Sequence, residues 1–185
     1  MIGFSLILAC TINGGIGKDN TIPWNIKEDL KLFQDITTHI DYNLHSIKKN
    51  AIIMGRKTWE SLPYKPLKNR LNIIITSNPK KINSSKNNNV LAYDNLDRAL
   101  EYCSNDISIN DIFVIGGKTL YELCLFNPHY SKYLTYIHLS IIPKNYLCDT
   151  FIDLKKIIKL YKNYNINDIL FYNNFIYIKF IVSFQ

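Results

Sequence analysis

Residues 111–125 read DIFVIGGKTLYELCL, which is a short apolar run, a pair of glycines and a segment with helical spacing. The apolar run predicts a buried strand, and the glycines end it before a helix begins. Residues 51–62, AIIMGRKTWESL, repeat the same order of strand, glycine and helix. Because strands that alternate with helices are joined by right-handed crossovers, the two stretches predict a largely parallel sheet.

The flanking sequence extends this pattern in both directions, with a polar loop expected at 78–89. Further strands are expected at 3–10, 71–76, 90–93 and 134–142, and further helices from Lys27 and from Leu96. Residues 169–184 are rich in Ile, Phe and Tyr around a turn at Asn173-Asn174, which is typical of antiparallel strands. We therefore predict one α/β domain over residues 1–185, with a mostly parallel twisted sheet of about eight strands, an antiparallel C-terminal hairpin and about four flanking helices.

The composition is that of an ordinary globular protein. Of the 185 residues, 47% are hydrophobic and 20% are charged, which excludes intrinsic disorder for most of the chain. No apolar run reaches the roughly 18 residues of a membrane span. The formal net charge of +7 favours anionic partners, although a lysine-rich solvated surface explains it equally well. The four cysteines are far apart, which predicts reduced thiols in an intracellular protein.

Asp29 is the first candidate for chemistry, because it lies four positions before Phe33 on the expected helix from Lys27. One interpretation is a carboxylate that stabilises the helix N-terminus. The other is a carboxylate in an apolar pocket, with a raised pKa, that binds a cationic or amidine-like ligand. In YLTYIHLSII the alternation places Thr135 on the face of Ile137 and Leu139, so its hydroxyl needs a partner if buried, and Asp29 is a candidate.

Two strand–glycine–helix junctions are candidates for phosphate binding. At Gly116-Gly117, backbone N–H groups and a helix N-terminus can face an anion, although a packing role for the glycines explains them as well. Gly55-Arg56-Lys57-Thr58 adds two cations at a helix start, where they oppose the helix dipole unless an anion binds. Arg70 is one of only three arginines, and it is either a carboxylate-binding group or a surface residue.

Other chemistries find little support in the sequence. The four histidines have no metal-ligand spacing with one another or with the cysteines, so no metal site is expected. No G-x-S-x-G motif is present, and the lysines do not interleave with aromatic residues as in RNA-binding motifs. We therefore expect a small-molecule ligand, and neither nucleic acid nor a membrane as partner.

Taken in order, these motifs resemble the dihydrofolate reductase family over essentially the whole chain. The matching segments are IGKDNTIPW at 16–24, Glu28-Asp29-Leu30 with Phe33, IMGRKTWESLP at 53–63, Pro66-Leu67 with NRLN at 69–72, Ile115-Gly116-Gly117 with Tyr121, Leu134-Thr135, and Asp149-Thr150-Phe151. Each segment is short, but the ordered set is specific. The resemblance implies a cytoplasmic oxidoreductase that uses NADPH to reduce 7,8-dihydrofolate to tetrahydrofolate, with hydride transfer to C6 and protonation at N5.

The same resemblance implies a role in one-carbon metabolism and thymidylate synthesis, and antifolate inhibitors as further ligands. It leaves open whether the chain is a free enzyme or the reductase part of a fusion with thymidylate synthase. The catalytic residues that it implies are Asp29, which binds N3 and the 2-amino group of the pterin, Thr135, which backs Asp29, and Trp24, which shapes the loop and holds a water.

Substrate and cofactor contacts are also implied by position. The implied substrate-binding residues are Ile7, Leu8, Asp29, Leu30, Phe33, Ser61, Leu62, Leu67, Arg70, Ile115 and Tyr121. The implied cofactor-binding residues are Ala9, Ile16, Gly17, Gly55, Arg56, Lys57, Thr58, Thr76, Ser77, Gly116, Gly117, Lys118, Thr119, Leu120 and Tyr121. Within these sets Arg70 grips the glutamate α-carboxylate, and Ser77 lies near the adenosine 2′-phosphate, which favours NADPH over NADH.

Two departures from the family pattern are visible. Leu8 is larger than the expected Val or Ala, which predicts a narrower pocket beside the pterin, and Ile152 or Asp153 replaces a proline after Asp149-Thr150-Phe151. Three other readings are weighed against a dihydrofolate reductase: a related reductase of the riboflavin pathway, a non-catalytic nucleotide-binding module and a nucleic-acid-binding protein. The combination of Asp29, Phe33 and Arg70 is not expected in the riboflavin-pathway reductase, and the sequence features above disfavour all three.

Overall fold

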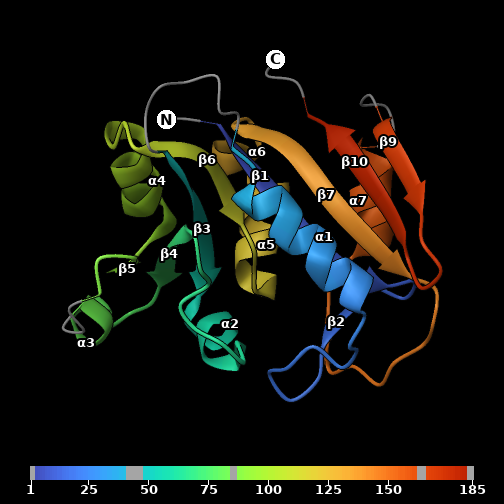
Figure 1. Ribbon diagram of the computed structural model, residues 1–185. Coiled ribbons are helices and arrows are strands. Elements are labelled where there is room, and N and C mark those ends of the chain that lie inside the picture. Colours follow the sequence, from blue (N-terminus) through green and yellow to red (C-terminus); the bar gives the residue numbers. More distant parts are fainter. Residues whose placement is uncertain (1–2, 41–47, 84–86, 162–165, 183–185) are drawn as a thin grey trace.

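The computed structural model describes residues 3–40, 48–83, 87–161 and 166–182 (Figure 1). Its centre is an eight-stranded sheet with the order β5-β4-β3-β6-β1-β7-β10-β9. The strands are β1 (Phe4–Thr11), β3 (Lys49–Gly55), β4 (Arg70–Ile75), β5 (Val90–Tyr93), β6 (Ile109–Val114), β7 (Leu134–Ile142), β9 (Ile166–Phe171) and β10 (Ile176–Ile181). The six strands from β5 to β7 are parallel, whereas β10 is antiparallel to both β7 and β9. The predicted sheet and C-terminal hairpin are thus confirmed.

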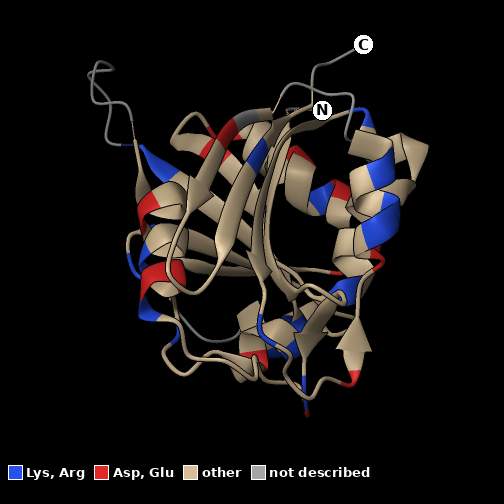
Figure 2. Cartoon of the chain, turned by 90° about the vertical axis from the view of Figure 1, so that its right-hand side faces the viewer, with Lys and Arg blue, Asp and Glu red and all other residues tan. Residues whose placement is uncertain are grey.

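Helices cover both faces of the sheet, as the side view in Figure 2 shows. The helices are α1 (Lys27–Thr38), α2 (Arg56–Ser61), α3 (Pro79–Asn83), α4 (Leu96–Asn105), α5 (Lys118–Phe126), α6 (Pro128–Ser131) and α7 (Leu154–Tyr161). Apolar residues of α4, α5 and α7 form one large core on one face of the sheet. On the other face, α1, α2 and α3 cover two smaller clusters. In the described part of the chain, no helix has the length and apolar character needed to cross a bilayer.

Several short elements differ from the expectation. The two-residue strand β8 (Thr150–Phe151) pairs with β2 (Gly15–Gly17), and α3 lies inside the segment expected to be a loop. Such short elements depend on contacts with distant residues rather than on a local pattern, so periodicity does not reveal them. Residues 84–86 of the expected loop and 183–184 of the expected hairpin lie outside the described residues.

All four cysteines are free thiols. Cys10, Cys103 and Cys124 are buried, and burial raises the pKa of each of these thiols to about 12. Cys148 is only half-buried, and its sulfur faces β2, since a Cβ atom added at Gly15 would lie 2.5 Å from it.

A buried polar pair lies between β7 and β10. Nδ1 of His138 is 2.7 Å from the hydroxyl of Tyr177, and the rings of Phe113 and Tyr136 flank the imidazole. Burial, followed by the charge of Lys179, lowers the pKa of His138 to about 4. The imidazole is therefore neutral in the folded protein at neutral pH.

This pair predicts a loss of stability in mild acid. Between pH 6.5 and about 4 the unfolded chain binds a proton at His138 that the folded chain does not bind. The free energy of unfolding should therefore fall as the pH falls through this window, by up to about 3 kcal/mol. Urea denaturation at both ends of the window measures the loss, which should shrink in the double variant His138→Phe, Tyr177→Phe. An unchanged loss in that variant would assign the acid sensitivity to other groups.

Candidate active site

The two strand–glycine–helix junctions predicted from the sequence meet at the carboxyl ends of β3 and β6. The backbone N–H of Gly55 donates to the carbonyl of Gly116 at 2.7 Å, and a Cβ atom added at Gly117 would lie 3.2 Å from Oγ1 of Thr58. Gly116 has a φ of 118°, a conformation that favours glycine. In parallel sheets, ligands bind at the carboxyl ends of the strands, and here two helix N-termini converge there.

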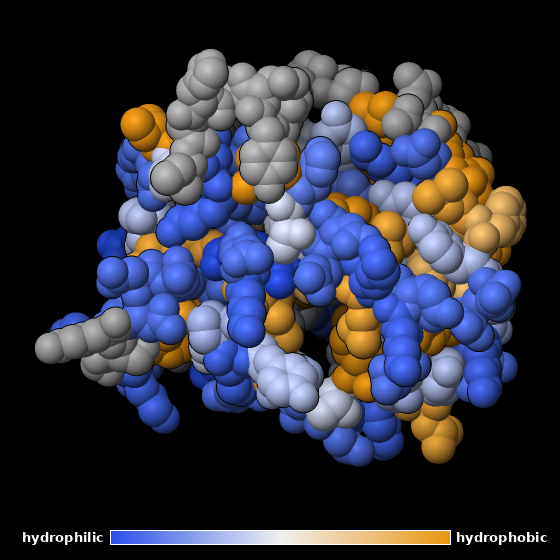
Figure 3. All heavy atoms as spheres, in the orientation of Figure 1, coloured by the Kyte–Doolittle hydropathy of each residue, from blue (hydrophilic) through white to orange (hydrophobic). Residues whose placement is uncertain are grey.

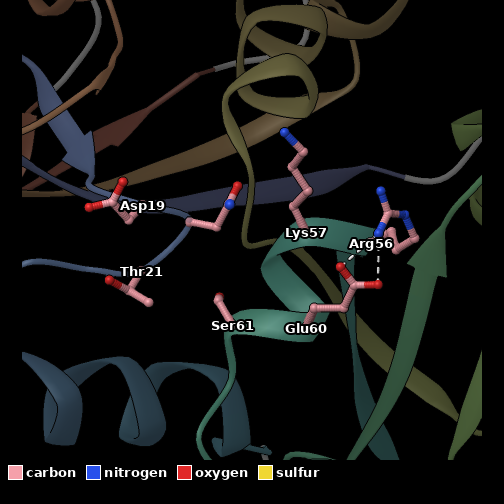
Figure 4. A pocket seen from close by; sticks show the side chains of 7 residues that line it. Asp19, Thr21, Arg56, Lys57, Glu60 and Ser61 are labelled. Carbon is pink, nitrogen blue, oxygen red and sulfur yellow. Dashed lines mark hydrogen bonds and ion pairs between the residues drawn. The ribbon is translucent and has the colours of Figure 1, made fainter.

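A pocket of about 410 Å³ opens between α2 and the loop that connects β1 to α1. Its lining residues are Asp19, Asn20, Thr21, Arg56, Lys57, Glu60 and Ser61. Figure 4 shows Thr21 and Ser61 on opposite sides of the pocket, while Arg56 pairs with Glu60 along α2. Figure 3 shows a hollow below the centre of the same face, between α2 and the start of α1. The pocket is thus lined by cationic and carboxylate side chains and by the hydroxyl groups of Thr21 and Ser61.

The loop from β1 to α1 is fastened to the segment after β7. Besides the β2–β8 pairing, the N–H of Asp19 donates to Oδ2 of Asp149 at 2.8 Å, and the N–H of Asp149 donates to the carbonyl of Gly17 at 3.0 Å. Gly14 has a φ of 80°, and a Cβ atom there would lie 2.2 Å from the carbonyl oxygen of Ile152. Only glycine fits this close approach, which fixes the base of the loop.

An apolar wall lies beneath α1 on the same face of the sheet. Five of the predicted substrate-binding residues belong to one cluster there: Ile7, Phe33, Leu62, Leu67 and Ile115. Trp24 lies in a neighbouring cluster with Phe175 and Tyr177, and Ala9 packs against it. The two clusters provide the flat apolar surface that an aromatic ligand requires.

Asp29 is half-buried on α1 above this wall. Burial raises the pKa of its carboxyl group, and a hydrogen bond with the hydroxyl of Ser140 on β7 partly counteracts the rise. Burial raises the pKa of Tyr121, and the charge of Asp29 adds to the rise. A carboxylate in such surroundings is suited to bind a cationic or amidine-like group, because that ligand stabilises its ionised form.

The prediction that Thr135 is the hydrogen-bond partner of Asp29 is wrong. The hydroxyl of Thr135 donates to the carbonyl of Phe4 at 3.0 Å and shares a hydrogen bond with the hydroxyl of Ser5 at 3.1 Å. Ile137 and Leu139 of β7 pack into the large core on the opposite face, so His138 and Ser140, which alternate with them, face α1. Ser140, rather than Thr135, therefore holds the carboxylate of Asp29.

A second correction concerns Leu8. This side chain is buried in the large core with Leu6 and Cys10, on the face of β1 opposite to Ile7. It therefore does not narrow the apolar wall beneath α1. Leu30 is 53% exposed and lies outside the buried clusters.

Replacing Ser140 by alanine tests the corrected assignment. Loss of the hydroxyl removes the one interaction that lowers the pKa of Asp29, so this pKa should rise further. We expect the acid limb of the pH profile of ligand binding to move to higher pH, by up to about one unit. Thr135→Val is the matched control, because it removes a β7 hydroxyl that bonds to Phe4 and Ser5 rather than to Asp29. An equal displacement in the control would contradict the assignment.

Arg70 is buried at the start of β4. Its Nε donates to the carbonyl of Lys68 at 2.9 Å, its Nη1 donates to the hydroxyl of Thr37 at 2.7 Å, and its Cζ lies 5.7 Å from the centre of the Phe33 ring. Among the described residues Nη2 has no acceptor, which leaves it for a ligand's carboxylate. Burial lowers the pKa of Arg70, so a carboxylate would compensate a partly desolvated cation.

Tyr121 connects the glycine pair to β1. Its hydroxyl donates to the carbonyl of Ile7 at 2.9 Å, and a Cβ atom added at Gly116 would lie 3.1 Å from that hydroxyl oxygen. Ser140, which holds Asp29, is the register partner of Ala9 on β1. Two residues of a strand span about 7 Å, so Asp29 and the glycine pair flank one short stretch of β1.

The remaining predicted cofactor residues lie around the same edge of the sheet. Ile16 and Gly17 are in β2, Thr76 and Ser77 follow β4, and Lys118, Thr119 and Leu120 form the first turn of α5. Thr76 and Leu120 are buried, whereas Ser77, Lys118 and Thr119 are exposed. The structure thus gathers elements that are far apart in the sequence at the ends of β1, β3, β4 and β6.

Sequence reasoning missed Ser140, and it placed Asp19, Asn20 and Thr21 in a matching segment at 16–24 without assigning them individually to the site. A usable signal existed for Ser140, because it and His138 are two positions apart among apolar residues, a spacing that places both on one face of a strand. The loop residues carry no such signal, since their place in the pocket depends on the pairing of β2 with β8.

Comparison with known proteins identifies the family. The dihydrofolate reductase family model matches residues 3–164. The dihydrofolate reductase of Heliothis virescens is 34% identical over 152 residues, covering 81% of this chain and 78% of that protein. The dihydrofolate reductase of Pneumocystis carinii is 35% identical over 159 residues, covering 82% of this chain and 74% of that protein.

A second group of relatives is longer. The bifunctional dihydrofolate reductase-thymidylate synthase 1 of Arabidopsis thaliana is 40% identical over 157 residues, covering 80% of this chain. The alignments span only 28% and 26% of the two bifunctional proteins of this plant. Because the family model matches most of this chain, the chain belongs to the dihydrofolate reductase family.

Proposed function

We propose that the chain reduces 7,8-dihydrofolate to 5,6,7,8-tetrahydrofolate with NADPH. The observation that carries the proposal is the half-buried carboxylate of Asp29, with a raised pKa, beside the stretch of β1 that also contacts the glycine pair. A pterin presents an amidine-like edge, formed by N3 and the 2-amino group, which matches a carboxylate in bidentate geometry. Family membership supports the same chemistry.

In this proposal Asp29 orients the pterin and favours a proton on it. The ionised carboxylate accepts from the 2-amino group and N3, and the hydroxyl of Ser140 holds it in place. Phe33, Leu62 and Ile115 pack against the ring system, and Arg70 binds the glutamate α-carboxylate. The protonation of N5 is favoured because a negative charge lies close to the ring in apolar surroundings.

The fit of the cofactor rests on the two glycine junctions. A Cβ atom at Gly116 or Gly117 would lie 3.1–3.2 Å from Tyr121 or Thr58, so only glycine leaves the backbone open to a close anion. The N-termini of α2 and α5, with Lys57, Thr58 and Lys118, would hold the phosphates, and Ser77 would lie near the 2′-phosphate. When bound, NADPH supplies the hydride that reduces C6 of the substrate.

The loop between β1 and α1 would exclude water from the reacting atoms. Its base is held by β2, β8 and Asp149, while Asp19, Asn20 and Thr21 line the pocket opposite α2. Excluding water strengthens the interaction between Asp29 and the ligand. Trp24 packs at the end of this loop and would limit how far it opens.

We further propose that residues 1–185 act as one reductase domain and that thymidylate synthase is a candidate partner. Support comes from the bifunctional dihydrofolate reductase-thymidylate synthases of Arabidopsis thaliana and Daucus carota, whose names join the two activities. Production of tetrahydrofolate would serve one-carbon metabolism and thymidylate synthesis.

One assay tests the function. Purified chain is mixed with NADPH and dihydrofolate, and the loss of the absorbance of reduced nicotinamide is followed with and without methotrexate. We expect oxidation that requires dihydrofolate and stops with the antifolate. Binding of NADPH without oxidation would indicate a nucleotide-binding module instead, and salt-sensitive binding to nucleic acid would point to the basic surface as the functional feature.

A further inference from the structure

A fully buried asparagine lies beside Arg70 in the sheet. Asn50 is the second residue of β3, and it is the direct register partner of Arg70 on β4. Its Nδ2 donates to the carbonyl of Thr37 at 3.0 Å and to the carbonyl of His39 at 2.8 Å. The last carbonyls of a helix have no partner within the helix, so this amide binds the C-terminal end of α1.

The other end of the amide is held by β6. Oδ1 of Asn50 accepts from the backbone N–H of Asp111 at 3.1 Å and from Nδ2 of Asn110 at 3.3 Å. Both donors and both acceptor sites of the side chain are therefore occupied, which fixes its orientation. A rigid link thus runs from the sheet to the last turn of α1.

Thr37 connects the last turn of α1 to the guanidinium group of Arg70. It is buried, its hydroxyl donates to the carbonyl of Phe33 at 2.7 Å, and the same oxygen accepts from Nη1 of Arg70 at 2.7 Å. The Phe33 ring, on the same helix, packs against the guanidinium. The direction of the arginine fork therefore depends on where the last turn of α1 lies.

We infer that Asn50 is a positioning residue for carboxylate recognition. It holds the end of α1 so that Thr37 orients Arg70 toward the glutamate α-carboxylate of the substrate, an inference that rests on the proposed function. Because Asn50 points to the helix end and not to the pterin wall, its contribution should concern the carboxylate end of the ligand alone.

The test compares two substrates. Asn50→Ala should raise the KM for dihydrofolate about tenfold, the size of a typical coupling between contacting residues. The KM for 6-methyl-7,8-dihydropterin, which has no glutamate, should change less than about twofold. Asn83→Ala is the matched control, because the Asn83 amide also bonds to a backbone N–H and a carbonyl, those of Ala92 on the edge strand β5. This control should leave both values unchanged.

A double-mutant cycle separates positioning from a general loss of stability. In an Arg70→Leu background, Asn50→Ala should have no further effect on the KM for dihydrofolate, since the group it positions is gone. If Asn50→Ala does not fold, Thr37→Val keeps the volume and removes the acceptor for Nη1. We expect the same selective rise in KM for Thr37→Val, and recovery in Thr37→Ser, which keeps the hydroxyl.

The outcomes are distinct. A wild-type chain that oxidised NADPH with neither substrate would contradict the proposed function and the inference together. A wild type active on both substrates, with Asn50→Ala or Thr37→Val impairing both equally, would overturn the inference alone. Additive effects of Asn50→Ala and Arg70→Leu on the KM for dihydrofolate would overturn it as well.

Discussion

Replacing Asp29 by asparagine is expected to preserve the fold and to lower reductase turnover at neutral pH by about a hundredfold or more. The amide keeps the shape of the carboxylate and a hydrogen bond with Ser140, but it carries no negative charge to favour protonation of the pterin. Turnover is measured as NADPH oxidation at saturating dihydrofolate. Near-wild-type turnover would rule out a catalytic role for Asp29.

The same variant should be at least as stable as the wild type. Because burial raises the pKa of Asp29 in the folded state, the ionised carboxylate opposes folding at pH values above that pKa. Removing the charge should therefore raise the free energy of unfolding at neutral pH, measured by urea denaturation. Asp35→Asn is the matched control, since Asp35 lies on the same helix but is exposed and paired with Lys31. That control should change neither turnover nor stability appreciably.

Arg70→Leu should weaken the binding of dihydrofolate by about a hundredfold and should change the binding of NADPH little. Removing one partner of a buried charge pair costs about 2–5 kcal/mol, most of it from the other charge left without its partner. The dissociation constants of both ligands, measured by fluorescence titration, give the comparison. Arg70→Lys should recover only part of the affinity, because an ammonium group cannot reproduce the planar fork.

A control for this prediction is available on α4. Arg98 is exposed and pairs with Asp94, so Arg98→Leu removes the same formal charge without touching the candidate site. It should leave both dissociation constants unchanged. Equal weakening of dihydrofolate and NADPH in Arg70→Leu would show that the residue supports the fold rather than the ligand's carboxylate.

The sequence predicts the sheet well because its signals are local. The apolar runs that become β1, β3 and β6 are each followed by a glycine or by small residues, and alternation with helices leaves few topologies. The glycine junctions share this property, since the strand, the turn and the helix are contiguous. Motif order along the chain then implies most of the candidate site.

The sequence does not show which face of a strand meets which layer. Thr135 lies at a register shift between β7 and β1, which the sequence does not reveal. Both faces of β7 are largely buried, so hydropathy cannot say which hydroxyl lies beneath α1 next to Asp29. The resemblance places Leu8 beside the ligand by position alone, and position in a motif likewise does not show which face of the strand a side chain occupies. Asn50 was missed for a related reason, because its hydrogen bonds join residues 11, 13, 60 and 61 positions apart.

The distribution of the thiols has a practical consequence. Burial protects three of the thiols from ionisation, those of Cys10, Cys103 and Cys124. A thiol reagent should therefore modify the folded chain at Cys148 alone. The sulfur of Cys148 rests against Gly15, at the foot of the loop that borders the pocket. The rate at which Cys148 is labelled should therefore report how often that loop opens, without an engineered probe. The rate should fall when a bound ligand keeps the loop closed.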